Sequence, residues 1–266
     1  MSGPATSSPA LRCEIDGRGI ATLLLNRPEK GNCYNQSMLD ALVAELARLA
    51  ADAAVRAVVL RGAGKHFCGG AEIGAAPSQP AETGRPRASI PIVCDTLDRL
   101  PKPTIALVHG ACIGGGVALV CCCDVVIAAD DAFFSMPEVR LGFAPGPLIP
   151  IFLRAIDTRH LRRYLLSGER FKADEAMRVG LVHALCPAEA KEQALARLID
   201  ELLMAGPNAA AHAKALLRRL GGTPISQELL AELQADFDQR FRSDEANEGR
   251  ASFREKRKPA WYRKPS

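Results

Sequence analysis

Apolar positions in the first half of the chain follow the spacing of short strands that alternate with helices. Residues 11–15 and 20–25 are apolar runs on either side of Asp16-Gly17-Arg18-Gly19, which predicts a β-hairpin. From Ser37 to Ala50 the apolar side chains recur every three or four residues, which predicts an amphipathic helix. Further strands are expected at 55–60, 104–108 and 125–128, and further helices at 90–100 and just after residue 116. This alternation predicts an α/β fold with parallel strand pairing.

The pattern changes after Pro150, where helical spacing dominates. A last strand is expected at 181–185, and helices are expected at 188–204, 209–220 and 226–241, between Gly-Pro and Gly-Gly-Thr-Pro breaks. No exact internal repeat is present. The chain is therefore expected to divide into a disordered tail (1–10), a sheet-rich core (11–200) and a C-terminal helical region (201–266).

Composition and charge narrow the class of protein. The 266 residues are 48% hydrophobic and 24% charged, which is ordinary for a globular protein and excludes a disordered chain, a coiled coil or a small disulfide scaffold. Residues 250–266 hold seven basic residues and one acid, a local charge of +6, so the rest of the chain sums to −2 of the net +4. This balance argues against a nucleic-acid partner and fits a small polyanionic ligand contacted at one end.

One stretch imitates a membrane span. No formal charge occurs from Pro103 to Cys123, which is long enough to cross a bilayer. The stretch contains His109 and three consecutive glycines, 114–116, which would weaken a helix by roughly 2–3 kcal/mol relative to alanine. A buried strand, a turn and the start of a buried helix explain it better, so no membrane partner is expected.

The nine cysteines indicate a reducing compartment. Three of them are consecutive, at 121–123, and adjacent cysteines in an apolar run do not make a disulfide framework. The first residues show no signal-peptide pattern, so a cytoplasmic protein is expected, with these cysteines packed as small hydrophobes. There is no CxxC pair and no histidine spacing typical of ligands, so no metal site is expected. His66 and His109 are expected to be structural.

Two glycine-rich turns, at 61–73 and 109–117, each follow an expected buried strand. Neither contains the GxxxxGK[ST] phosphate loop, and neither fits GxGxxG with an acidic ribose partner. Glycine between a strand and a helix lets a ligand approach backbone N–H groups closely. Two such loops side by side could aim two donors at one oxygen; the alternative is that the glycines only make tight turns.

Placed together, these segments resemble the enoyl-CoA hydratase/isomerase (crotonase) family over roughly residues 11–258. The order and spacing of short motifs carry the resemblance. The motifs are Leu25-Asn-Arg-Pro-Glu-Lys30, Ala57-Val-Val-Leu-Arg-Gly62, His66-Phe-Cys-Gly-Gly-Ala-Glu-Ile73, Lys102-Pro-Thr-Ile-Ala106, His109-Gly-Ala-Cys-Ile-Gly-Gly-Gly116, Cys123-Asp-Val-Val-Ile127, Pro137-Glu-Val-Arg-Leu-Gly142, Leu166-Ser-Gly-Glu169, residues 176–182 and Phe253-Arg-Glu-Lys-Arg-Lys258. The resemblance implies a spiral of repeated ββα turns with a C-terminal helical region used in trimer assembly. It also implies an acyl-CoA thioester substrate and a homotrimer or dimer of trimers.

By position in that family, the backbone N–H groups of Ala71 and Gly115 would hold the thioester oxygen. Removing a proton beside a thioester, or adding a nucleophile across a conjugated double bond, puts negative charge on that oxygen. A preorganised donor there is worth ~3–4 kcal/mol of barrier. The flanking Gly70, Gly114 and Gly116 are expected substrate-binding positions. No cofactor is implied, because CoA is part of the substrate.

The acid–base residues depart from the hydratase pattern. Family hydratases commonly carry two glutamates; here the second is present as Glu138, whereas the first position holds Ala118. One glutamate can still move a proton between two carbons, as family isomerases do, so isomerisation is slightly favoured over hydration. A general base contributes about 10²–10⁴-fold, and partial burial would raise the pKa of Glu138 to a useful value.

Several further positions match or depart from the family. Lys30 falls in the loop that lies along the pantetheine of CoA, where Tyr34 replaces a smaller apolar residue. Lys256 is an expected partner for CoA phosphates, in the family those of a neighbouring subunit. Residues 143–150 carry three prolines and no polar side chain, which predicts a rigid, apolar wall for the acyl pocket.

Two rival functions remain at the level of sequence. One is an acyl-CoA decarboxylase or thioester hydrolase on the same scaffold, which needs the donor pair but not two glutamates. The other is a non-catalytic acyl-CoA-binding protein, because a fold does not fix a function.

Overall fold

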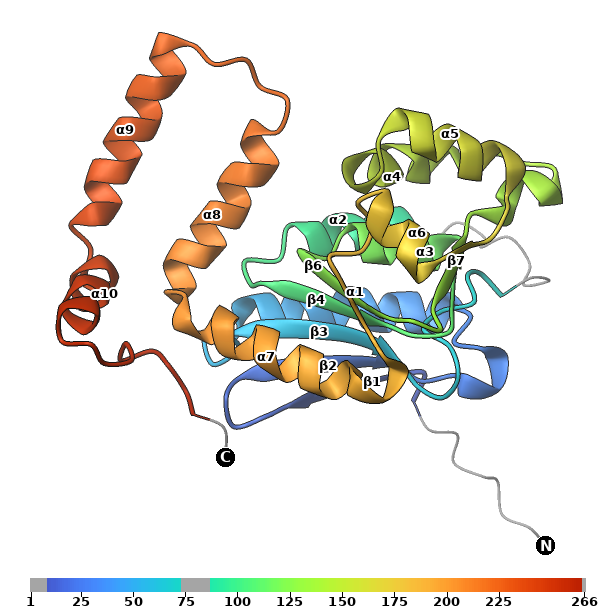
Figure 1. The fold of residues 1–266 in the computed structure, drawn as a ribbon, viewed down its shortest axis with the longest axis horizontal. Coiled ribbons are helices and arrows are strands. Elements are labelled where there is room, and N and C mark those ends of the chain that lie inside the picture. Colours follow the sequence, from blue (N-terminus) through green and yellow to red (C-terminus); the bar gives the residue numbers. More distant parts are fainter. Residues whose placement is uncertain (1–8, 73–86, 265–266) are drawn as a thin grey trace, which may run out of the picture.

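Two sheets form the centre of the computed structural model, which describes residues 9–72 and 87–264 (Figure 1). The larger sheet has the order β1 (Leu11–Ile15), β2 (Ile20–Leu25), β3 (Ala57–Gly62), β4 (Thr104–Val108), β6 (Val125–Ala129) and β9 (Ala184–Cys186). The smaller sheet has the order β5 (Ala111–Ile113), β7 (Phe133–Ser135) and β8 (Phe171–Lys172). The β1–β2 hairpin is antiparallel and every later pair in the larger sheet is parallel, which confirms the predicted architecture.

Helices cover both faces of the larger sheet, and this explains why its central strands are almost wholly apolar. All five residues of β4 and five of the six in β3 are buried. On one face lies α1 (Gln36–Ala51), which buries Met38, Leu39, Leu42, Leu46 and Leu49. The other face packs against α7 (Lys191–Met204) through Leu195, Ile199 and Leu203.

The remaining helices follow the strands in chain order. They are α2 (Ile90–Asp98), α3 (Gly115–Cys121), α4 (Ile149–Ala155), α5 (Thr158–Ser167), α6 (Ala173–Arg178), α8 (Pro207–Leu220), α9 (Gln227–Phe241) and α10 (Asp244–Arg254). Short 3₁₀ turns lie at η1 (Pro28–Lys30), η2 (Pro137–Leu141), η3 (Gly146–Leu148) and η4 (Ala188–Ala190). In Figure 1, α8 to α10 stand away from the sheets as a separate arm.

The expected spiral is visible in the strand pairing. A turn consists of a strand in the larger sheet, a short extended segment in the smaller one, and a helix, as in β4–β5–α3. Isolated parallel bridges between Cys68 and Cys112 and between Tyr34 and Ala71 extend this pattern to the earlier turns. Equivalent points of successive turns therefore lie side by side, although the sequence itself does not repeat.

The structure corrects several details of the predicted elements. Strands β5, β7 and β8 and helix α10 were not expected, β3 begins at 57 rather than 55, and the last strand covers 184–186 rather than 181–185. Residues 1–8 of the expected tail lie outside the described residues. The expected division at residue 200 falls within α7 and stays a prediction.

The uncharged stretch from 103 to 123 divides into β4, β5 and α3, as its glycines indicated. Among the described helices, none is long and apolar enough to cross a membrane. All nine cysteines are free thiols, and Cys122 and Cys123 are buried in the apolar core as expected.

Candidate active site

Glu138 lies in η2, directly after β7, with its carboxyl group half-buried. Its Oε2 atom is inaccessible to solvent and has no hydrogen-bond partner among the described residues. Burial raises the pKa of Glu138 above its usual range, as predicted from the apolar neighbours in the sequence. An unpaired carboxyl group of raised pKa is suited to taking and returning a proton.

The glycine turn before α3 lies directly against this carboxyl group. Gly114 has a φ of +54° and donates its N–H to the carbonyl oxygen of Ser135 at 2.8 Å. A methyl group on Gly114 would lie 2.7 Å from Oε1 of Glu138. The absence of a side chain at 114 therefore lets Glu138 approach the first turn of α3.

Two backbone donors remain unused beside this turn. The N–H groups of Ala71 and Gly115 donate to no described residue. The two loops touch, because a methyl group on Gly70 would lie 3.2 Å from the carbonyl oxygen of Ile113. Ala71 is exposed and Gly115 is buried, so the pair lies where the surface meets the interior.

Tyr34 joins the two loops. Its backbone N–H donates to the Gly70 carbonyl at 2.9 Å, and its carbonyl accepts from the Glu72 N–H at 3.1 Å. Its ring reaches the other loop, where a methyl group on Gly115 would lie 2.8 Å from Cε1 and 2.9 Å from Cζ. Burial, and then the nearby Cys68 and Glu138, raise the pKa of the Tyr34 phenol. The sequence identified Tyr34 only as a departure from the family pattern.

Asn32 holds the loop that carries Tyr34, and sequence reasoning missed it. It is fully buried with a φ of +57°, and its side chain accepts from the Arg27 N–H at 2.9 Å. Its amide donates to the carbonyls of Ala63 at 2.8 Å and His66 at 2.6 Å. A Gly-Asn pair after a short helical turn, with Asn able to adopt positive φ, was the available signal.

An ion pair fixes the same loop from its outer side. Arg27 donates to the Cys33 carbonyl at 2.6 Å and to Glu72 Oε2 at 2.8 Å. The loop before α1 is therefore held at both ends, and the segment from Gly70 to Glu72 is tied to it. This network fixes the position of Tyr34 relative to Ala71.

The other predicted residues occupy different surroundings. Gly116 packs against Cys68, whose Cβ would be 2.9 Å from a methyl group there. Lys30 is exposed in η1, and Lys256 is exposed after α10, on the opposite side of the molecule from α3 (Figure 1). Lys256 therefore does not approach Glu138 of its own chain.

The two histidines beside the glycine loops make structural hydrogen bonds. Nδ1 of His66 accepts from the Ala111 N–H at 3.1 Å, and Nε2 of His109 lies 2.8 Å from the Gly64 carbonyl. Ala118 is completely buried, so the helix offers no carboxylate at that position. The proline-rich segment 143–150 is largely exposed in this chain, with Phe143 more than half exposed.

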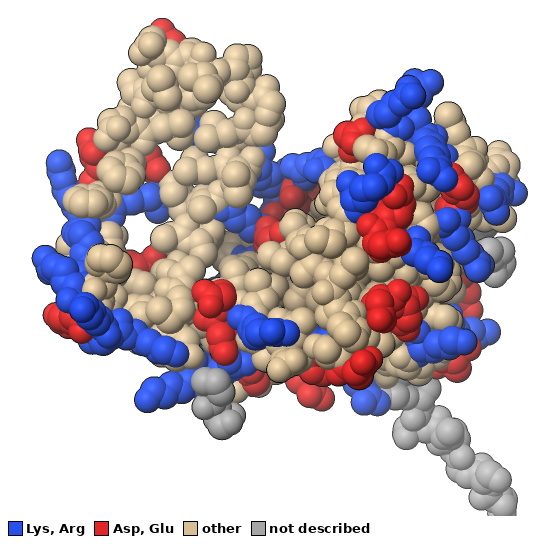
Figure 2. Space-filling view, viewed as in Figure 1, with Lys and Arg blue, Asp and Glu red and all other residues tan. Residues whose placement is uncertain are grey.

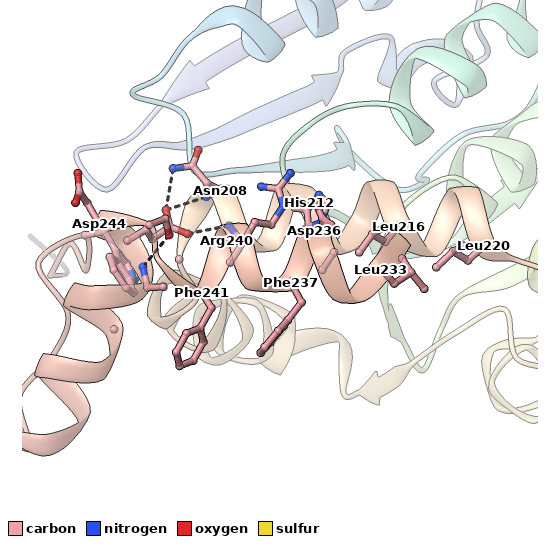
Figure 3. Close-up of a pocket in the computed structure, with 18 residues that line it drawn as sticks. Asn208, His212, Leu216, Leu220, Leu233, Asp236, Phe237, Arg240, Phe241 and Asp244 are labelled. Atoms are coloured by element: carbon pink, nitrogen blue, oxygen red, sulfur yellow. Dashed lines mark hydrogen bonds and ion pairs between the residues drawn. The ribbon is translucent and has the colours of Figure 1, made fainter. Parts of the chain in front are cut away.

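A large groove lies elsewhere, between α8, α9 and α10 (Figure 3). It has a volume of about 830 Å³, and its lining includes Leu216, Leu233, Phe237 and Phe241. His212 and Asp236 form an ion pair along it at 2.6 Å. None of the residues near Glu138 lines this groove. No cluster of metal-ligating side chains occurs within residues 9–72 and 87–264.

Comparison with known proteins places this geometry in a family. The family model described as enoyl-CoA hydratase/isomerase matches residues 16–264. The 2,3-dehydroadipyl-CoA hydratase of Escherichia coli is 30% identical over 243 residues, which cover 90% of this chain and 94% of that protein. Two solved structures are also similar. AtuE of Pseudomonas aeruginosa has a TM-score of 0.87 and 37% identity, covering 96% of this chain and all of that one. An enoyl-CoA hydratase from Shewanella pealeana has 0.85 and 32%, covering 95% and 96%.

The fold and the matched length define an enzyme of the acyl-CoA class. The chain belongs to the enoyl-CoA hydratase/isomerase (crotonase) family, which confirms the resemblance drawn from the sequence motifs.

Proposed function

We propose that the protein converts an enoyl-CoA thioester through an enolate, with Glu138 as its single acid and base. The amides of Ala71 and Gly115 receive the thioester oxygen, and the negative charge collects between them. The observation that carries this proposal is the juxtaposition of an unpaired, half-buried carboxyl group with two unused backbone donors.

Isomerisation is the reaction that these groups support best. The carboxylate of Glu138 takes a proton from C2 of a 3-enoyl-CoA, and the electron pair moves into the dienolate. The protonated carboxyl group then returns the proton to C4, leaving a double bond between C2 and C3. One carboxyl group suffices for both transfers, and the buried methyl of Ala118 offers no second one to hold water.

Hydration is the second candidate, and the names of relatives favour it. The similar proteins of Escherichia coli and Shewanella pealeana are both called hydratases. Addition of water to a 2-enoyl-CoA passes through the same enolate and uses the same two donors. It additionally needs a group that holds the attacking water, and Glu138 would then have to both activate the water and protonate C2.

Incubation with a 3-enoyl-CoA and a 2-enoyl-CoA in heavy water distinguishes the two reactions. Isomerisation gives the 2-enoyl product with deuterium at C4 or C2, and hydration gives a 3-hydroxyacyl-CoA detected by mass. Formation of the 3-hydroxy product as the main species would contradict the preference for isomerisation. Release of free CoA or of carbon dioxide would indicate the hydrolase or decarboxylase alternative. Binding without any conversion would indicate a binding protein.

We further propose that the protein assembles as a homotrimer or a dimer of trimers. The unpartnered apolar groove on the C-terminal arm supports assembly, because exposed apolar patches of this size mark interaction surfaces. In such an assembly Lys256 contacts the CoA phosphates bound by a neighbouring copy, and Lys30 lies along the CoA of its own chain. The side chain of Lys256 makes no ion pair with any described residue, which leaves its charge available.

A further inference from the structure

The hydroxyl group of Tyr34 is the polar group nearest the two candidate donors that the proposed mechanism leaves without a role. Its ring tip packs against the backbone of Gly115, and its own backbone pairs on both sides of Ala71. One residue thus contacts the loop of each donor. The hydroxyl makes no hydrogen bond to any described residue.

A buried ring whose hydroxyl group has no partner is unusual, because a buried polar group without a hydrogen bond costs about 1–3 kcal/mol. The Tyr34 oxygen is not sealed from solvent, unlike Oε2 of Glu138. Its hydrogen-bonding capacity is therefore directed to whatever occupies the space beside Gly115.

We propose that Tyr34 is a catalytic residue whose hydroxyl group donates a third hydrogen bond to the thioester oxygen, beside the amides of Ala71 and Gly115. This inference rests on the proposed function, because it assigns a further donor to the same oxygen. An oxygen received by the Gly115 amide lies next to the ring tip that packs on that residue.

The ionisation state of the phenol agrees with a donor. Burial raises the pKa of Tyr34 above its ordinary value near 10, and the nearby Glu138 raises it further. The phenol is therefore protonated throughout the range in which Glu138 works. It donates a hydrogen bond to developing negative charge, and it does not compete with Glu138 as a base.

The position of Tyr34 also explains how α3 tolerates alanine at 118. Gly115 and Ala118 lie three residues apart and so share one face of α3. At Gly115 that face is covered by the tip of the Tyr34 ring. A polar group supplied from the first turn of the spiral thus stands beside a helix face that carries none of its own.

The test compares Tyr34→Phe with the unsubstituted enzyme in three measurements: kcat, KM and exchange of the C2 proton with heavy water. Loss of one donor to the enolate oxygen is expected to lower kcat and the exchange rate together by about 10²-fold, with KM nearly unchanged. The acidic limb of the pH profile is expected to stay where it is, because Glu138 is not displaced. Tyr164→Phe is the matched control, since the Tyr164 hydroxyl bonds to Glu175 away from the site, and its kcat should not change.

A spectroscopic measurement separates a donor from a spacer. With ¹³C-labelled butyryl-CoA, a saturated thioester with no double bond to move, the infrared band of the bound carbonyl is expected to shift to higher frequency in Tyr34→Phe. An unchanged band and unchanged kcat in Tyr34→Phe, with losses confined to Tyr34→Leu, would overturn the proposal and make the ring a spacer. Absence of both turnover and C2 exchange in the unsubstituted enzyme would instead overturn the proposed function, and the role of Tyr34 with it.

Discussion

At the scale of single residues, the environment of Glu138 decides what the site can do. A carboxyl group in water has a pKa near 4.3 and is a weak base. Here burial raises the pKa, while a backbone hydrogen bond within the residue opposes the shift. The apolar neighbours that cause this burial were visible in the sequence, but the approach of Gly114 was not, because it depends on two turns of the spiral meeting.

The raised pKa predicts the pH dependence of the reaction. The active form for proton removal is the carboxylate, so kcat/KM is expected to rise with pH through the pKa of Glu138. The acidic limb should therefore lie above the ordinary value of 4.5. Glu138→Gln should lower turnover by about 10²–10⁴-fold, whereas Glu14→Gln, on exposed β1, should leave the profile intact. A limb at or below 4.5 would contradict the assignment of Glu138.

The same shift has a consequence for stability. A carboxyl group whose pKa is raised by folding stabilises the folded state below its unfolded pKa, and that contribution is lost as pH rises through the folded pKa. Glu138→Gln is therefore expected to melt at a higher temperature than the unsubstituted protein at pH 7, and at a similar temperature near pH 3. Thermal denaturation at both pH values checks this; equal melting temperatures at pH 7 would show that the folded carboxylate carries no cost.

Asn32 gives a prediction of a different kind, because both its side chain and its backbone are constrained. Asn32→Ala removes three buried hydrogen bonds and places alanine at a φ of +57°, so we expect a loss of about 2–4 kcal/mol. Asn32→Gly loses the same bonds but tolerates this φ, and should be more stable than Asn32→Ala by about 1 kcal/mol. Denaturant unfolding of both variants tests the two terms separately. If Asn32→Gly were the less stable of the two, backbone strain would not contribute.

At the scale of elements, predictability followed length. The hairpin, α1 and β4 have enough alternating or helical positions to be predicted from spacing alone. Strands β5, β7 and β8 have only two or three residues each, too few for any periodicity to show. These short strands bring the donor loops together, so the sequence could name Ala71, Gly115 and Glu138 only through the family resemblance.

The start of α3 allows a direct test of this assembly. A methyl group at Gly115 collides with the Tyr34 ring, so Gly115→Ala is expected to cost about 1–3 kcal/mol. Combining it with Tyr34→Ala, which vacates the space, should cost clearly less than the sum of the two single changes. Gly146→Ala, where a methyl group meets open space, is the control and should be nearly neutral. Additive costs in denaturant unfolding would show that Tyr34 does not pack on Gly115.

At the scale of the whole molecule, the C-terminal arm has apolar surface that the chain itself does not cover. Leu217 is 77% exposed, Ile225 81% and Phe237 57%. Figure 2 shows that the upper part of this arm carries few charged side chains, whereas Lys and Arg gather over α5 and around α10. The helical spacing of the arm was readable from the sequence. What covers its apolar face was not, because spacing marks an apolar face without identifying its partner.

We expect this face to be buried between copies of the chain, so the protein should sediment at about three or six times the chain mass of 28.4 kDa. Leu217→Asp combined with Phe237→Asp places charge on both helices and should reduce the assembled fraction, because a buried unpaired charge is costly at an interface. Ala231→Asp lies on α9 two residues before Leu233, on the side away from the groove, and serves as the control. If CoA phosphates are bound by Lys256 of a neighbouring copy, the dissociated variant should also have a raised KM. A monomeric unsubstituted protein with full activity would show that the site is complete within one chain and that Lys256 has no role in it.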